Sequence, residues 1–313
     1  FLKFDRIFST YIRFLPKSFF QFINAMISWF SEKLYLEKNI KKVLGWKKNI
    51  KIVSHHLSHA ASAFYPSPYD SAAIIIFDSV GEWACTSIGK GEKNQIKILK
   101  EIHFPNSLGM FYSAFTQFSG FRVNADEYKL MGLAPYGEPK YKEKILENII
   151  KVNEDGSYKL NLKFFDFHHG NSTINNKFEK LFGYNKRDTN EEIREIDCDL
   201  AASAQSVLDE IFIKIARTAK KITGSKNVVL AGGVALNCVS NGKLVESKIF
   251  ENVWIQPASN DAGGALGAAL SLYYLDSNGE LNKTSQEGSF FGPAFKDDEI
   301  ENYLKNMKIN YKK

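Results

Sequence analysis

Three of the six histidines stand within five residues of one another, at His55, His56 and His59. If this segment is helical, His55 and His59 are four residues apart and share one face, where their rings can hold a single metal ion. The small and apolar residues 60–64 suit a buried helix, which Pro66 is expected to end. The alternative is a hydrogen-bonded histidine pair at the start of a helix, because this spacing also occurs by chance.

A carboxylate follows soon after in the chain. Asp78 closes the apolar run 72–77, which has the composition of a buried strand. A carboxylate at the end of a strand, beside a helix that carries two histidines, predicts a metal pocket.

Two glycine turns lie in the C-terminal half. The first, at residues 231–237, follows an apolar strand pattern and opens a helix. Its two adjacent glycines, Gly232 and Gly233, let the backbone come close to a ligand and point amide hydrogens at phosphate oxygens. It is neither a Walker loop nor a Rossmann fingerprint. A tight turn with Asn237 as the helix cap is the alternative interpretation.

The second turn, at residues 257–269, contains Asp261 before a helix of small residues. Asp261 could be only an N-cap, with Gly263, Gly264 and Gly267 allowing close helix packing. Together with the histidine pair, however, the two turns suit a metal and a nucleotide held in a cleft between two lobes.

Composition limits the class of protein. The 313 residues are enough for two lobes around a sizeable core, and the charged fraction of 24% is ordinary for a globular protein. The net charge of +6 is spread along the chain without the dense basic face of a nucleic-acid binder, so it favours at most anionic substrates. The three cysteines are odd in number and far apart, which indicates a reducing, cytoplasmic compartment and argues against disulfides.

The pattern of apolar residues predicts the order of the elements. Residues 1–45 are expected to form amphipathic helices that pack onto a core, and a helix lying in a membrane interface is the alternative. No apolar run is long enough for a membrane span. Strands are expected at 72–78, 84–89 and 96–103, with 89–94 as a hairpin connection.

The second half of the chain is expected to begin with an irregular insertion at 152–198, whose His168 and His169 lie at the surface. A long helix at 199–223 is expected to follow, with a buried strand directly after it. The alternation of strands and helices predicts an α/β fold.

Six sequence blocks in order resemble the NodU/CmcH family of O-carbamoyltransferases. The resemblance runs from about residue 10 to residue 300, and it is carried by SHHLSHAASAFYPS, IIFDSVGEW, NSLGMFYSAFTQFSGF, DEYKLMGLAPYG, LAGGVALNCVSNGKL and QPASNDAGGALGAAL. It implies a Kae1-like domain, a two-lobed relative of the actin-like ATPases with mixed sheets flanked by helices.

The resemblance also implies a site. Its metal ligands would be His55, His59, Asp78 and Asp261, holding an iron-type divalent ion. An adenine nucleotide would be bound by the positions that match the family's cleft, which are Gly232, Gly233, Asn237, Glu127, Lys129 and Gly132.

The implied reaction activates carbamoyl phosphate with ATP as carbamoyl-adenylate. The carbamoyl group then passes to a hydroxyl of a sugar or another small acceptor. His56 is the first candidate for the group that takes the hydroxyl proton, although it could instead only orient a ligand.

The family's domain plan divides this chain into a first lobe at 1–105, a second lobe at 106–275 and a linker at 276–313. Members of the family begin with a β-hairpin and end with a YrdC-like domain thought to make the adenylate. The resemblance therefore implies a fragment, truncated at both ends and expected to be inactive alone.

Two other functions stay open. One is threonylcarbamoyl transfer to tRNA, as in the Kae1/TsaD proteins, against which the lack of a basic face argues. The other is a non-catalytic nucleotide-binding module, because fold alone does not determine function. No nucleic-acid partner is expected, and a homodimer is kept open as the oligomeric state.

Overall fold

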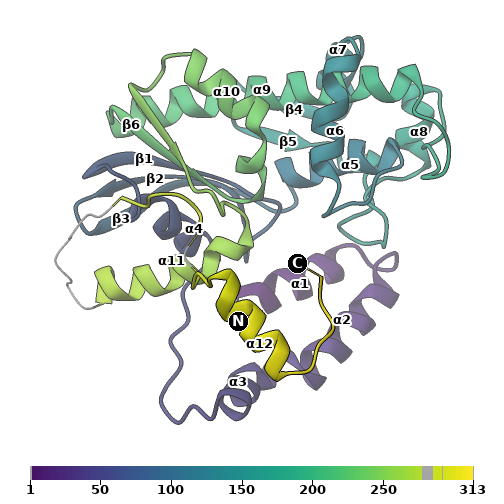
Figure 1. Ribbon diagram of the computed structural model, residues 1–313. Helices are drawn as coiled ribbons and strands as arrows, with labels where there is room; N and C mark the ends of the chain where they lie inside the picture. The colour runs from purple at the N-terminus through teal and green to yellow at the C-terminus, as the bar shows by residue number, and fades with distance from the viewer. Residues whose placement is uncertain (1, 277–284, 291, 313) are drawn as a thin grey trace.

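The chain alternates helices and strands in a computed structural model that describes residues 2–276, 285–290 and 292–312 (Figure 1). The helices before the sheet are α1 (Leu2–Arg13), α2 (Phe19–Ser31), α3 (Leu36–Leu44) and α4 (His55–Phe64). The middle of the chain contains β1 (Ser71–Phe77), β2 (Ala84–Glu92), β3 (Gln95–His103), α5 (Leu108–Phe118), α6 (Glu127–Leu133), α7 (Lys142–Asn148), β4 (Ile150–Val152), β5 (Tyr158–Leu160) and α8 (Asn176–Phe182). The rest contains α9 (Glu195–Thr223), β6 (Asn227–Ala231), α10 (Cys238–Glu246), β7 (Asn252–Ile255), α11 (Gly264–Ser271) and α12 (Asp297–Asn306).

The main sheet has five strands in the order β3-β2-β1-β6-β7. β1 pairs antiparallel with β2 and parallel with β6, so the sheet is mixed and takes strands from both sides of residue 105. Every residue of β1 after Ser71 is buried, as expected for a central strand that is covered on both faces.

Alternate residues of β1 enter two different cores. Ile75 and Phe77 face the core formed with α5 and α9, where the Phe77 ring stacks on Phe212 at a centroid distance of 4.0 Å. Ile74 and Ile76 face the smaller core formed with α4. The predicted α/β class, with a mixed sheet between helices, is confirmed.

The connection between β2 and β3 is shorter than predicted. Residues 89–92 belong to β2, and only Lys93 and Asn94 form the turn. A Cβ atom at Gly91 would lie 2.5 Å from the Phe64 ring of α4. This glycine is therefore required for helix packing against the strand, which explains why it misled the turn prediction.

The N-terminal helices do not all pack onto a core, and that prediction is wrong for α2 and α3. Neither helix has a buried residue, and Phe20 of α2 is 76% exposed. The aromatic side chains of α1 and α2 contact each other instead, as in the edge-to-face pair of Phe4 and Trp29 at 5.2 Å. No helix in the described part of the chain is both long and apolar enough to cross a membrane.

The segment 152–198 is more ordered than predicted, since it contains β5 and α8. Its His168 is only 3% exposed, so the expected surface position is wrong for this residue. A distant part of the chain buries it: the Phe14 ring, just after α1, packs edge-on against the His168 ring at a centroid distance of 4.3 Å. The predicted linker at 276–313 contains α12, while residues 277–284, 291 and 313 of it lie outside the described residues.

Candidate metal centre

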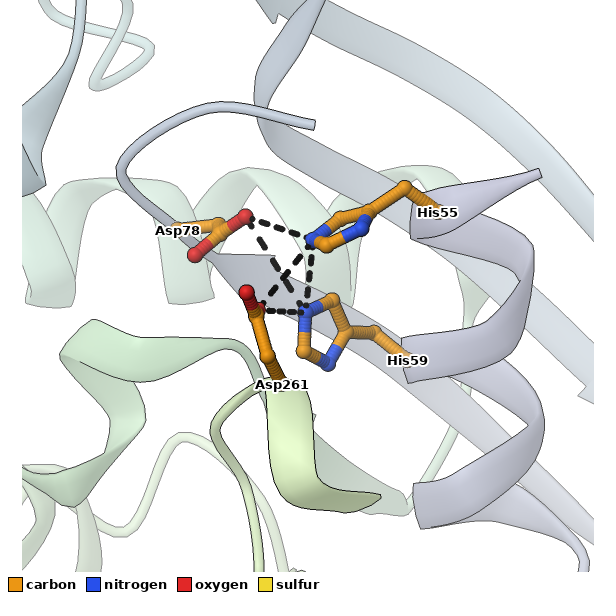
Figure 2. Close-up of side chains that lie close together, drawn as sticks. All are labelled: His55, His59, Asp78 and Asp261. Carbon is orange, nitrogen blue, oxygen red and sulfur yellow. Dashed lines mark hydrogen bonds and ion pairs between the residues drawn. The ribbon is translucent and has the colours of Figure 1, made fainter. Parts of the chain in front are cut away.

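Four side chains from three separate segments converge on one point (Figure 2). His55 and His59 lie on the first two turns of α4, Asp78 directly follows β1, and Asp261 begins the short 3₁₀ turn η5 (Asp261–Gly263) before α11. One ligand atom from each residue lies within 4.8 Å of the others. The structure therefore brings together all four residues that the sequence singled out as metal ligands.

The distances show that both imidazole rings point their Nε2 atoms inward. His55 Nε2 lies 3.1 Å from Asp78 Oδ2. The Nε2 atoms of His55 and His59 are each 3.4 Å from Asp261 Oδ1 and 3.1 Å from each other. Two inward nitrogens and two carboxylates form a donor set that suits a divalent transition metal such as iron, manganese or zinc.

The hydrogen-bonding capacity of the two inward Nε2 atoms also fits a bound cation. The two Nε2 atoms lie 3.1 Å apart and can share at most one hydrogen between them. A cation bound by the two Nε2 atoms and the carboxylates would satisfy both inward nitrogens.

The protonation states of Asp78 and His59 agree with a metal site, whereas His55 must give up a proton to bind a metal. Burial opposes ionisation of Asp78, but its hydrogen bond with His55 and the nearby histidines lower its pKa to about 2. The same hydrogen bond raises the pKa of His55, whereas burial lowers the pKa of His59. Around neutral pH, Asp78 is thus ionised and His59 is neutral, which are the forms that coordinate metals.

The loop after Asp78 sets the position of α4. Both carboxylate oxygens of Glu82 accept the backbone N–H of His55 at 3.1 Å, so Glu82 caps the helix in place of the Ser54 side chain. A Cβ atom at Gly81 would lie 2.9 Å from the His56 ring and 3.1 Å from the His55 ring. Sequence reasoning missed both roles, although both residues stand in the IIFDSVGEW block.

His56 occupies a different environment from its two neighbours. It is 4% exposed, its Nδ1 shares a 2.6 Å hydrogen bond with the Ser87 hydroxyl, and its Nε2 lies 4.0 Å from Asp78 Oδ2. Burial lowers its pKa to about 4. Its Nε2 forms no hydrogen bond in the described part of the protein, and this buried position argues against direct contact with an acceptor hydroxyl.

The first glycine turn borders the cluster. Gly232 has φ +91°, and its Cβ would lie 2.2 Å from the Phe77 carbonyl oxygen. Its amide donates to the Ser259 carbonyl at 2.7 Å, so this N–H is committed within the protein. Gly233 is more open, since its Cβ would meet only Asp78 Oδ1, at 3.7 Å. Of the two glycines, Gly233 is the one that a phosphate beside the metal centre could approach.

Asn237 serves as a helix cap, which was the alternative interpretation. Its side chain accepts the Ser240 N–H at 2.9 Å and exchanges hydrogen bonds with the Gln205 amide. Gln205 in turn accepts from the Tyr112 hydroxyl and donates to Asp209. The Asn237 amide is thus part of a buried polar network beneath the turn.

The helix α6, which carries three of the predicted positions, contacts the start of α10 through Met131. The Met131 sulfur is 3.8 Å from Cys238 Sγ, which places α6 beside that turn. Glu127 accepts from the Ser113 hydroxyl at 2.7 Å, and Lys129 pairs with Asp126 at 3.0 Å. Gly132 has open space around it. Of the three positions, Glu127 and Lys129 are thus engaged within the protein, whereas Gly132 leaves open space beside its backbone.

A protein-family model and several relatives match this chain. Residues 2–270 match the family model described as "Carbamoyltransferase N-terminus". The chain is 47% identical to the uncharacterized protein sll1178 of Synechocystis sp., over 98% of this chain and 52% of that protein. It is also 37% identical to the nodulation protein NolNO of Sinorhizobium fredii, over 71% of this chain and 31% of that one.

Among solved structures, the crystal structure of T. kodakarensis HypF aligns with 76% of this chain and 39% of the HypF chain. The sequence identity is 17% and the TM-score is 0.38. The chain spans about half the length of the Synechocystis relative.

Proposed function

Because the chain belongs to the carbamoyltransferase family and matches its N-terminal region, we propose that it contributes the carbamoyl-transfer site of an O-carbamoyltransferase. The carbamoyl donor in this proposal is carbamoyl-adenylate, made from carbamoyl phosphate and ATP. The acceptor is a hydroxyl of a sugar or another small metabolite.

The convergence of His55, His59, Asp78 and Asp261 is the observation that carries the proposal. These side chains would hold a divalent metal, which supplies Lewis-acid polarisation of a carbonyl when it is bound. Gly233 lies beside Asp78, so a nucleotide phosphate next to its backbone would also be next to the metal centre.

The proposed step exchanges one bond to the carbamoyl carbon for another. The acceptor oxygen forms a bond to that carbon, the bond to the adenylate phosphate oxygen breaks, and AMP leaves. The hydroxyl proton must be taken up at the open side of the cluster. The Asp261 side chain, which is 78% exposed, faces that side, whereas Asp78 and His59 lie buried behind it.

Metal content provides the first test. The purified protein should contain about one equivalent of a divalent metal, and both His55→Ala and His59→Ala should lose it, because each removes one of very few ligands. His103→Ala is the matched control, since this exposed histidine pairs with Glu101 and is not a member of the cluster. Unchanged metal content in both cluster variants, measured by mass spectrometry of the ions, would reject the assignment.

Transfer is tested separately with labelled carbamoyl phosphate and ATP. A full-length protein that carries this region should pass the label to a hydroxylated acceptor, and His59→Ala should abolish the transfer. Label found only in hydrolysis products with every acceptor tested would contradict the proposal.

A further inference from the structure

A cavity of about 760 Å³ separates α1 from the part of the chain that carries α7, β4 and β5. Figure 1 shows α1 and α2 beneath this part of the molecule. Four cationic side chains line the cavity, Arg13 at the end of α1 and Lys151, Lys159 and Lys163 opposite it, against one carboxylate, Glu147. The metal cluster is not part of its wall.

The four cations are available for a ligand. Within the described ranges of the chain, none of them forms an ion pair with a carboxylate. Four positive charges and one negative charge around a single cavity create a positive potential that attracts anions.

Arg6 adds a second, independent observation. It lies seven residues before Arg13 and therefore on the same face of α1. It is 9% exposed, and its Nε has no hydrogen-bond partner in the described part of the protein. Its guanidinium lies 5.2 Å from the centre of the Phe104 ring, and Phe104 itself lines the cavity. Arg6 does not itself line the cavity, but a buried cation without an ion pair is costly, and an anion held behind the Phe104 ring would reduce that cost through space.

Two aromatic rings give the cavity an apolar wall. Trp83 and Phe104 both line it, and the Trp83 indole is held in place because its N–H donates to Asp5 at 3.2 Å. Ligand pockets commonly combine such aromatic surface with a few polar groups that orient the ligand. The combination here fits a ring-shaped, hydroxylated molecule that bears a negative charge.

The cavity is also linked to the metal centre through a single loop. Trp83 directly follows Glu82, which caps α4 at His55. Burial lowers the pKa of the Arg6 guanidinium, and the negative charge of Glu82 opposes that change. The metal centre and the cavity therefore share one loop, in which Glu82 contacts α4 and Trp83 lines the cavity.

We propose that this cavity binds an anionic sugar, either a sugar phosphate or a sugar acid. This binding does not rest on the proposed function, because the cavity and the metal centre have separate walls.

Calorimetry on the full 313-residue chain tests the binding with four probes. They are glucose 6-phosphate, glucuronate, uncharged glucose and inorganic phosphate. At least one anionic sugar should bind, more tightly than glucose or phosphate, and its affinity should fall with added salt. The preferred sugar distinguishes a phosphate ligand from a carboxylate ligand.

The double variant Arg13→Gln/Lys159→Gln should weaken that binding by about tenfold, since two charge contacts are lost. Lys221→Gln is the matched control, because it removes one exposed lysine near the end of α9, away from the cavity. Thermal unfolding should show that all variants remain folded.

Three outcomes would overturn the proposal. They are no binding of either anionic sugar, equal affinities in the double variant and the control, and binding of inorganic phosphate as tight as that of the sugars.

Discussion

Gly267 of α11 lies directly against the backbone of α4, and replacing it by alanine should disturb both the stability and the metal centre. A Cβ atom built at this position would lie 1.8 Å from the Ser58 carbonyl oxygen and 2.9 Å from the Ser62 nitrogen. Both obstacles are backbone atoms, so no side-chain rotation can relieve the contact. The two helices must therefore move apart.

The size of the effect follows from these distances. An ordinary carbon–oxygen contact is about 3.3 Å, so α11 must shift by roughly 1.5 Å. Overpacking of this kind costs about 3 kcal/mol, while the better helix propensity of alanine returns about 1 kcal/mol. The net loss of about 2 kcal/mol corresponds to a fall in Tm of about 3 °C for a chain of this length.

The same shift should weaken metal binding. Ser58 lies between His55 and His59, and Asp261 lies just before α11, 3.4 Å from His59 Nε2. Four donors must each reach about 2.0–2.2 Å from one ion, which a displacement of that size prevents. We expect the affinity for a divalent metal to fall at least tenfold, in the range seen when groups that support metal ligands are lost.

Gly264→Ala is the matched control on the same helix. A Cβ atom there would meet nothing within 4 Å, so this variant should keep its metal affinity and gain up to about 1 kcal/mol of stability. Urea unfolding gives the free energies, and titration with Co²⁺ or Fe²⁺ gives the affinities. If Gly267→Ala matches Gly264→Ala in both measurements, the helix contact does not position the ligands as argued.

Three further outcomes are expected. Glu82→Gln should keep the fold but lower metal affinity by about 10- to 100-fold, because the charged cap of His55 is lost; an unchanged metal titration would contradict this. Gly233→Val should leave the unfolding curve intact, since its Cβ has room, yet abolish adenine-nucleotide binding in calorimetry; retained binding would make the turn purely structural. Burial lowers the pKa of His168 to about 4, so the unfolded state binds its proton more readily and stability should fall as the pH drops from about 6.5 towards 4. His168→Leu should flatten that part of the pH–stability curve, and an unaltered slope would show that protonation of this ring is not involved.

The sequence by itself determined the local chemistry of the site. The i,i+4 spacing of His55 and His59 requires only that the segment be helical, and the apolar run before Asp78 requires only a buried strand. Both conditions depend on neighbouring residues, so both could be predicted. The mixed α/β class followed from the same alternation of patterns.

Tertiary structure alone decided which residues support that chemistry. Glu82 caps a helix that begins 27 residues earlier, and Gly91 makes room for a ring from α4, so neither role has a local signal. His168 is polar and lies in a polar segment, yet Phe14 covers it from the N-terminal part of the chain. The cavity beside α1 likewise joins Arg13 to lysines that follow it by more than 130 residues. Burial and charge clustering depend on which distant segments meet, and no periodicity along the chain records that.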